Sequence, residues 1–87
     1  MRYRSRTDII NDILDAVNGG GGGGATKTKI MYKAYLSFTQ MKEYLRVLTE
    51  NNLLKYDVYT QTFKITEKGL KFLQTYDQMD DLIMEAE

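Results

Sequence analysis

Cysteine and histidine are both absent from this 87-residue chain. Their absence excludes thiolate nucleophiles, imidazole bases and zinc sites built from cysteine and histidine. Because nothing depends on disulfides, the sequence fits an intracellular protein best, and we expect it in the cytoplasm. The apolar runs are only a few residues long, so we expect neither a membrane span nor a signal peptide.

Net charge is absent as well, because 12 basic residues balance 12 acidic ones. The two signs are nevertheless separated along the chain. Residues 1–76 hold all 12 basic residues with seven acidic ones, whereas residues 77–87 hold five acidic residues and no base. Such a separation suggests two surfaces with different roles. The length indicates one domain with a modest core.

Residues 5–17 have the period of an amphipathic helix. Ser5 or Thr7 would cap its start, Asp8 would lie in its first turn, and Asn18 with Gly19 would end it. Its core-facing stripe would consist of Ile9, Ile10, Ile13, Leu14 and Val17.

A second, short helix is expected over residues 26–35 or 28–35. Ser37 and Gln40 then form the S-x-x-Q pattern of a capping box, which opens a third helix over residues 38–51. Two short helices joined by a tight turn predict a helix-turn-helix. The buried positions would be Ile30, Met31 and Ala34 in the second helix and Met41, Leu45 and Leu48 in the third.

After the third helix the period changes to two, which indicates strands. Residues 54–58 and 63–65 alternate apolar and polar side chains, and residues 59–62 would turn the chain into a hairpin. A minimal strand around residues 25–26 could pair with this hairpin. Thr66 would cap a last helix that runs towards the C-terminus.

This order of elements predicts a mostly α fold with a small β-hairpin, in the α+β class. The pattern is that of a winged helix-turn-helix followed by one extra helix. We expect the winged helix-turn-helix domain in residues 1–66. The C-terminal helix, residues 67–87, would form part of the same compact unit.

Six consecutive glycines, residues 19–24, separate the first two helices. Gly19 and Gly24 have the spacing of the first two glycines in a phosphate-binding loop. Ala25, however, stands where that loop needs its lysine, and a helix rather than a strand precedes the run. The run does not separate two domains of sensible size either. Because extra loop length costs only about 0.6 kcal/mol per doubling, we expect a slack, mobile connection.

The outer face of the helix at residues 38–51 is the candidate surface for reading DNA. In a helix-turn-helix the second helix enters the major groove, and its N-terminal residues meet the base edges. Amide, hydroxyl and charged side chains suit that task, although an ordinary solvated helix face would have a similar composition. The candidates are Thr39, Gln40, Lys42, Glu43 and Arg46.

Three groups of residues around this helix would contact phosphates or the minor groove. The first is an N-terminal arm, whose arginines would share one side if it is extended; the alternative is a frayed terminus. The second is the helix before the reading helix, and the third is the hairpin acting as a wing. The residues are Arg2, Arg4 and Arg6 in the arm, Lys27, Lys29 and Lys33 in the helix, and Tyr59, Thr60, Thr62 and Lys64 in the hairpin.

The last helix carries an apolar seam with 4-3-4-3 spacing, which is typical of a two-heptad coiled coil. We expect it to join a second copy of the chain; the alternative is that the helix folds back on its own core, where Leu70 and Leu73 would pack. An antiparallel pair would bring the acidic end beside the partner's Lys68 and Lys71. The seam residues are Phe72, Tyr76, Met79, Ile83 and Ala86.

Acidic residues cluster near both ends of the chain. Neither cluster has the 12-residue calcium loop with its glycine and terminal glutamate. Solvated faces are therefore expected, with no metal, cofactor or small-molecule ligand. Nor can a nucleophile be paired with a base, so we expect no enzyme. The clusters are Asp8, Asp12 and Asp15, and Asp77, Asp80 and Asp81.

Three stretches give the chain a resemblance to a known family: "LSFTQMKEYL" at residues 36–45, "NLL" at residues 52–54 and "TFKITEKGLKFL" at residues 62–73. It resembles the small archaeal winged-helix DNA-binding proteins that have a C-terminal dimerisation helix. The resemblance implies double-stranded DNA as partner and a homodimer joined by an antiparallel coiled coil. It also implies that Ser37, Thr39, Gln40 and Lys42 begin the recognition helix.

The sequence therefore predicts a homodimeric DNA-binding protein, either sequence-specific or chromatin-like, that acts as a transcriptional regulator and associates with the nucleoid. A different class of protein remains open. A winged-helix module for protein–protein interaction, without DNA binding, would also fit the zero net charge and the exposed Glu43 and Glu50.

Overall fold

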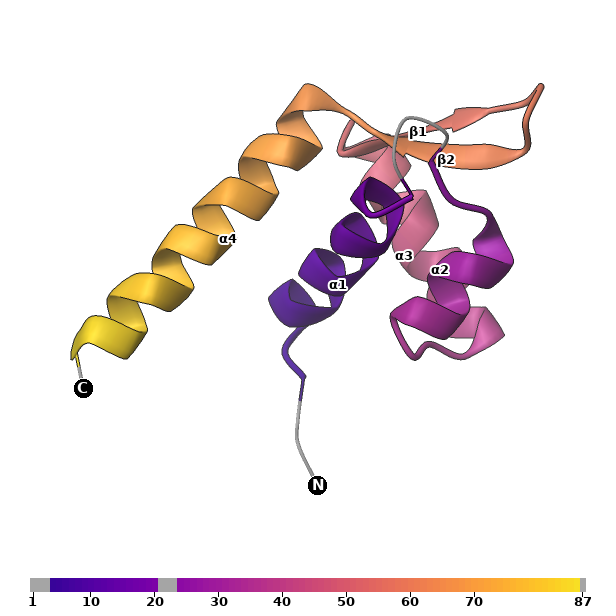
Figure 1. Ribbon diagram of the computed structural model, residues 1–87. Helices are drawn as coiled ribbons and strands as arrows, with labels where there is room; N and C mark the ends of the chain where they lie inside the picture. Colours follow the sequence, from indigo (N-terminus) through magenta and orange to yellow (C-terminus); the bar gives the residue numbers. More distant parts are fainter. Residues whose placement is uncertain (1–3, 21–23, 87) are drawn as a thin grey trace.

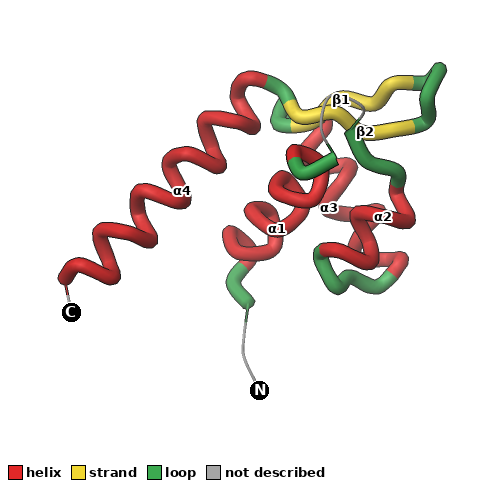
Figure 2. Tube along the Cα trace, viewed as in Figure 1, coloured by secondary structure: helices red, strands yellow, loops and turns green. Residues whose placement is uncertain are grey.

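The computed structural model describes residues 4–20 and 24–86, with side chains described up to Tyr76. Four helices and one hairpin follow each other in the predicted order, so the α+β winged-helix prediction is confirmed (Figures 1 and 2). The elements are α1 (Arg6–Asn18), α2 (Lys27–Lys33), α3 (Phe38–Glu50), β1 (Leu54–Asp57), β2 (Thr62–Ile65) and α4 (Glu67–Ala86).

The predicted helix starts are confirmed by their capping hydrogen bonds. Ser5 and Ser37 each accept a bond from the third helical N–H, and the side chains of Asp8 and Gln40 accept one in return, which makes two capping boxes. Thr26 caps α2 by accepting from the Lys29 N–H. The hydroxyl oxygen of Thr66 accepts from the Gly69 N–H at the start of α4.

The helix α2 is shorter than predicted. It ends at Lys33, and Ala34 is its cap rather than part of its last turn. Tyr35 has a positive φ of 54°, a left-handed conformation that stops the helix. The Leu36 N–H then bonds the Met31 carbonyl oxygen at 3.0 Å. This tight turn sets α3 against α2, as a helix-turn-helix requires.

The hairpin pairs β1 with β2 in an antiparallel register that places Tyr56 opposite Phe63. Val58, which the alternation assigned to a strand, lies in the turn instead, and Gln61 closes that turn with a φ of 55°. The predicted minimal strand is confirmed as an isolated bridge from Ala25 to Phe63. Two backbone hydrogen bonds, of 3.0 and 2.8 Å, join these two residues.

The two ends of the glycine run have a defined backbone, which the expectation of a slack connection missed. Gly24 has a φ of +73°, and a Cβ atom there would lie 2.2 Å from the Phe63 carbonyl oxygen. A Cβ atom on Gly20 would lie equally close to the Gly24 carbonyl oxygen. Only glycine tolerates such approaches. Residues 21–23, on which the expectation of mobility depends, lie outside the described residues.

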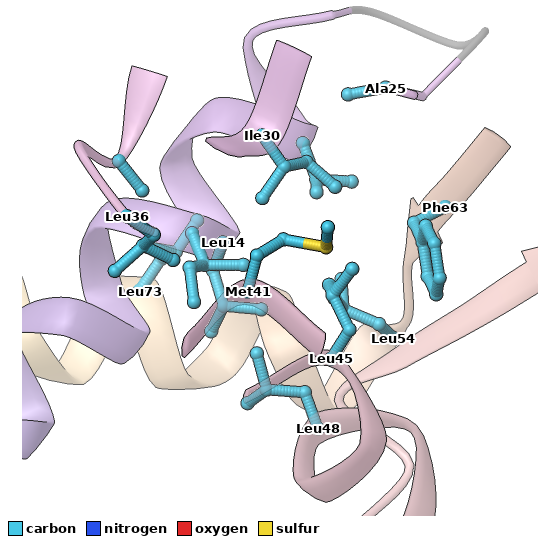
Figure 3. Close-up of a cluster of buried hydrophobic side chains, with 13 residues drawn as sticks. Leu14, Ala25, Ile30, Leu36, Met41, Leu45, Leu48, Leu54, Phe63 and Leu73 are labelled. Carbon is cyan, nitrogen blue, oxygen red and sulfur yellow. The ribbon is translucent and has the colours of Figure 1, made fainter. Parts of the chain in front are cut away.

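The core lies between α1, α2, α3 and the hairpin, and α4 closes one side of it (Figures 1 and 3). The predicted stripes of the first three helices supply most of it. Ile13, Leu14, Ile30 and Leu48 are fully buried. The other members are Val17, Ala25, Ala34, Leu36, Met41, Leu45, Leu54, Phe63 and Leu73.

The helix α4 packs its first half against α1, and its C-terminal half projects away from the other three helices (Figure 1). Leu73 is buried in the core, as expected, whereas Leu70 is 38 % exposed. The Tyr76 hydroxyl donates a hydrogen bond to the Asp8 carboxylate of α1. Within the part of the chain that the structure describes, no helix has the length and hydropathy needed to cross a membrane.

Candidate nucleic-acid interface

The helix α3 buries one face and leaves the opposite face in solvent, as its sequence predicted. Met41, Leu45 and Leu48 point into the core. Thr39, Lys42, Glu43 and Arg46 are exposed on the outer side. No described element covers this outer face, so its side chains can meet a partner.

A groove of about 370 Å³ runs between α3, the start of α2 and the hairpin. Its floor is apolar, because Met41, Leu45 and Phe63 line it. Three cations, Lys27, Lys42 and Arg46, line it as well. Side chains from α2, α3 and the wing therefore meet on one side of the molecule. Helix-turn-helix and wing thus offer a continuous surface with basic groups around an apolar strip.

Arg46 is held by two carboxylates of its own helix. Its guanidinium lies 2.7 Å from Glu43 Oε1 and 3.2 Å from Glu50 Oε1. The hydrogen bond to Glu43, followed by that to Glu50, raises the pKa of Arg46 above its ordinary value. This group of three charges has a net charge of −1. Any anion that binds Arg46 must therefore compete with the two glutamates.

Ser37 and Gln40 are already used in capping α3. The Ser37 hydroxyl oxygen accepts from the Gln40 N–H at 3.2 Å, and Gln40 Oε1 accepts from the Ser37 N–H at 3.0 Å. The side-chain NH₂ of Gln40 still has two donors for another partner, and its oxygen has a second lone pair. The cap therefore fixes where this amide is presented, at the exposed start of α3.

The lysines predicted as phosphate contacts lie in solvent on α2. Lys27, Lys29 and Lys33 are all exposed. Among the side chains that the structure describes, none of the three forms an ion pair with a carboxylate. Their charges are thus uncompensated locally, and so is that of Lys42 on α3.

The two described arginines of the predicted arm do not form an extended strand. The Arg4 guanidinium donates to Asp12 Oδ2 at 2.9 Å and to the carbonyl oxygens of Ala34 and Tyr35 at 2.6 and 3.1 Å. Carbonyl oxygens at a helix C-terminus attract cations, so Arg4 ties the start of α1 to the end of α2. Arg6 is already helical, with its guanidinium 6.0 Å from the Tyr44 ring centroid. Arg2 lies outside the described residues.

The hairpin turn presents the predicted wing residues. Tyr59 is 95 % exposed, and Thr60 is exposed beside it. The Asp57 carboxylate accepts from the Tyr59 N–H at 2.9 Å and lies 3.2 Å from Lys64 Nζ. Bonds from Tyr59 and Lys64 hold the pKa of Asp57 below its usual 3.8. The Thr60 and Thr62 hydroxyls bond each other at 2.7 Å. The positive charge of Lys64 is therefore partly offset by the carboxylate of Asp57.

The predicted dimer seam falls into two parts, one that packs on its own chain and one on the projecting half of α4. Phe72 is half-buried against the core of its own domain, and Tyr76 is bonded to Asp8. These two side chains face their own chain, which corresponds to the alternative in which the helix folds back. Met79 and Ile83 lie on the projecting half of α4, and their side chains are outside the described set.

One exposed side chain on this surface was missed by the sequence analysis. Phe38, the first residue of α3, is 62 % exposed, and the Lys42 ammonium lies 5.5 Å from its ring centroid. Spacing along the helix does not mark Phe38 as exposed, because it precedes Met41 by three residues and Leu45 by seven, as a member of the buried stripe would, and Lys42 by four. Its exposure is a feature of the tertiary structure.

The helix-turn-helix, the bridge at Ala25 and the two-stranded wing define a winged helix-turn-helix protein. The chain belongs to this family, because the winged helix-turn-helix family pattern matches residues 3–84. Among solved structures, it is similar to Sso10a-2, a DNA-binding protein from Sulfolobus solfataricus, with a TM-score of 0.79 and 20 % identity. That match covers 95 % of this chain and 85 % of the other. No curated protein gave a significant match.

Proposed function

We propose that this protein binds double-stranded DNA as a homodimer and acts as a transcriptional regulator or a chromatin-like protein. Its helix α3 would lie in the major groove and its wing on the adjacent backbone or minor groove. The observation that carries the proposal is the uncovered outer face of α3, which presents Thr39, Gln40 and Lys42 at the end that meets base edges in a helix-turn-helix.

The charges around this face support DNA rather than a neutral partner. Lys27, Lys29 and Lys33 on α2 and Lys42 on α3 are exposed, and none of them forms an ion pair with a described carboxylate. Basic groups of this kind neutralise phosphates and release counterions. Arg4 already donates to Asp12 and to two backbone carbonyl oxygens, so we leave it out of the proposed phosphate contacts. The lysines of α2 would supply most of these contacts. Lys64 would contribute a further phosphate contact from the wing, although its ion pair with Asp57 offsets part of its charge.

The family and the structural similarity add to this proposal. The winged helix-turn-helix family covers nearly the whole chain, and the protein from Sulfolobus solfataricus is described as DNA-binding. At 20 % identity, that similarity bears on the fold alone. The outer face of α3 therefore supplies the argument for DNA in this chain, independently of what its relatives bind.

The dimer would form through the projecting half of α4. Its first half is already packed on α1, so Met79, Ile83 and Ala86 are the part of the predicted seam that is left for a partner chain. Two copies would place two α3 helices in successive major grooves, about one helical turn apart, which is the usual geometry for dimeric helix-turn-helix proteins. We propose that residues 1–66 form the DNA-binding part of the same compact unit.

Binding to one duplex across a salt series tests the proposal. Affinity for DNA should fall steeply as salt rises. Lys29→Ala and Lys33→Ala should each weaken binding to all sequences alike and lower the salt slope by about one unit. Lys29→Arg and Lys33→Arg keep the charge and are the matched controls, so their slopes should stay at the wild-type value. A wild-type protein whose binding is absent or independent of salt would refute the proposal and favour a protein-interaction module.

A further inference from the structure

Phe38 is an apolar side chain at an unexpected place. It is 62 % exposed, although its spacing of three, seven and ten residues from the buried Met41, Leu45 and Leu48 is that of one helix face. Phenylalanine is among the residue types most often buried. Among the described aromatic side chains, only Tyr56 and Phe63 form a ring pair, so Phe38 does not stack on another ring. Among the described residues, the core and the side chains packed against it do not include Phe38.

The position of Phe38 on α3 is informative. It follows the capping Ser37 directly and is the first helical residue. In a helix-turn-helix, side chains at this end of the second helix reach the base edges. Lys42 and Arg46 follow at four-residue intervals on the same stripe. An apolar side chain thus stands at the leading end of a stripe of cations.

The Lys42 ammonium lies 5.5 Å from the Phe38 ring centroid, within the range of a cation–π contact. This contact keeps the ring beside a positive charge on the outer face. A neutral protein partner would have to desolvate that ammonium, whereas the DNA major groove offers it phosphate oxygens and guanine acceptors. The neighbourhood of Phe38 therefore suits a polyanion that also presents an apolar group.

The thymine 5-methyl group is the apolar feature that base edges present in the major groove. Building on the proposed function, we propose that Phe38 packs against this methyl group and makes the protein prefer thymine at one position of each half-site. Lys42 holds the ring and contacts the neighbouring phosphate or guanine. Burial of one methyl group corresponds to about 0.8 kcal/mol, or roughly fourfold in affinity.

The test compares one duplex in two forms, with thymine or with deoxyuridine, which differs from it only by the missing methyl. Duplexes selected from a random pool supply the sequence. Wild-type protein should bind the thymine form about fourfold more tightly for each methyl contacted. Phe38→Ala should bind both forms equally. Phe38 is exposed, so this change should leave the fold intact, which thermal unfolding of the variant checks.

Two controls separate the contact from other effects. Phe38→Leu keeps an apolar side chain and should retain most of the preference. Tyr32→Ala removes another aromatic side chain that is 72 % exposed, on α2, and should keep the full preference whatever its affinity. Equal wild-type binding of both duplexes would overturn the inference while leaving DNA binding intact, as would a preference that survives in Phe38→Ala. Failure to bind either duplex would instead refute the proposed function.

Discussion

Arg46 and Glu43 form an ion pair of 2.7 Å on the outer face of α3, at the centre of the proposed DNA surface. Glu50 holds the same guanidinium from the next turn, at 3.2 Å. The three side chains are all more than half exposed. The glutamates therefore oppose DNA binding in two ways. They compete with phosphates for the Arg46 guanidinium, and their own negative charge repels phosphates.

Removing either carboxylate should strengthen DNA binding. In Glu43→Gln or Glu50→Gln, Arg46 has one competitor fewer and the surface gains one unit of positive charge. We expect a several-fold higher affinity at about 0.1 M salt, where charges within roughly 10 Å are felt, and a smaller gain at higher salt. Binding isotherms at two salt concentrations measure this effect.

Glu67→Gln is the matched control, because it makes the same change of net charge at the start of α4. Its effect on affinity should be clearly smaller. If all three variants bind alike, the gain comes from net charge and the Arg46 pair has no special part. Weaker binding by the Glu43 or Glu50 variant would mean that a glutamate contacts DNA directly.

The proposed role of Gln40 in reading adenine has to be separated from its role in capping α3. Gln40→Ala removes the capping-box bond to Ser37 and the amide that could pair with adenine. Gln40→Glu keeps an N3 acceptor for the cap but removes the donor that adenine N7 requires. Only the alanine variant should lose stability, by about 0.5–1 kcal/mol. Both variants should lose about 1–3 kcal/mol of preference for a site with the contacted adenine.

The measurement for Gln40 is the affinity ratio between the selected site and the same site with one A·T pair replaced. A ratio avoids confusion with the extra negative charge of glutamate, which weakens both complexes. Urea unfolding of each variant reports the cap. A Gln40→Glu protein that keeps the wild-type ratio would show that this amide does not read adenine.

Most of the fold could be predicted because its signals are local. Ser37 and Gln40 specify the start of α3 through two bonds that span three residues, and the periods of the helices and strands assign the buried faces. Phe63 was expected to alternate in a strand, and the expected minimal strand around residues 25–26 is the bridge from Ala25 to Phe63. Local pattern and tertiary structure agree at these places.

Several missed features depend on residues that are far apart in sequence. Arg4 meets the carbonyl oxygen of Ala34, 30 residues away, and Tyr76 meets Asp8 across 68 residues. No periodicity encodes such contacts, because they arise only when the helices pack. The same holds for Gly24, whose need for glycine comes from the approach of Phe63. The candidate site was predicted as a helix face, but the charge pairs that tune it were not.

Gly24 should be the least replaceable residue of the glycine run. Gly24→Ala forces a side chain into a positive φ, which costs of the order of 1–3 kcal/mol, and into contact with the Phe63 carbonyl oxygen. Urea unfolding should show a loss at the upper end of that range or beyond. Gly19→Ala is the control, since Gly19 has a helical φ of −67°. Equal stability of the two variants would contradict the defined conformation of Gly24.

Shortening the run should be tolerated if Gly24 is kept. The backbones of Gly20 and Gly24 already approach each other closely, so the chain does not need the full length to connect them. Deletion of two glycines between them should change the free energy of unfolding by less than about 1 kcal/mol. A loss of several kcal/mol would mean that the deleted residues have packing of their own.

The wing turn should loosen in acid. The pKa of Asp57 is lowered in the folded protein by its bonds from Tyr59 and Lys64. A lowered folded pKa means that this contribution is complete above the ordinary value of 3.8 and is lost as the pH falls through the folded value. The Tyr59 amide proton shift, followed by NMR, should report a midpoint below 3.8. Asp57→Asn should abolish that titration; a midpoint at or above the ordinary value would contradict the bonding seen here.

Dimerisation should depend on the projecting half of α4. A parallel pair would set the acidic ends, with Asp80 and Asp81, beside their own copies. An antiparallel pair brings them towards the partner's Lys68 and Lys71 where the two helices overlap along most of α4 and not along the projecting half alone. Ile83→Glu places a charge in the apolar seam and should shift the protein from dimer to monomer in sedimentation equilibrium. Gln74→Glu, an equal change of charge at an exposed position, should leave the dimer in place. Because only the second half of the two-heptad seam is left for a partner chain, the wild-type dimer should dissociate at low micromolar concentration and weaken further in high salt if the lysine contacts contribute. A wild-type monomer at high protein concentration, or an Ile83→Glu variant that stays dimeric, would show that α4 does not join the two copies.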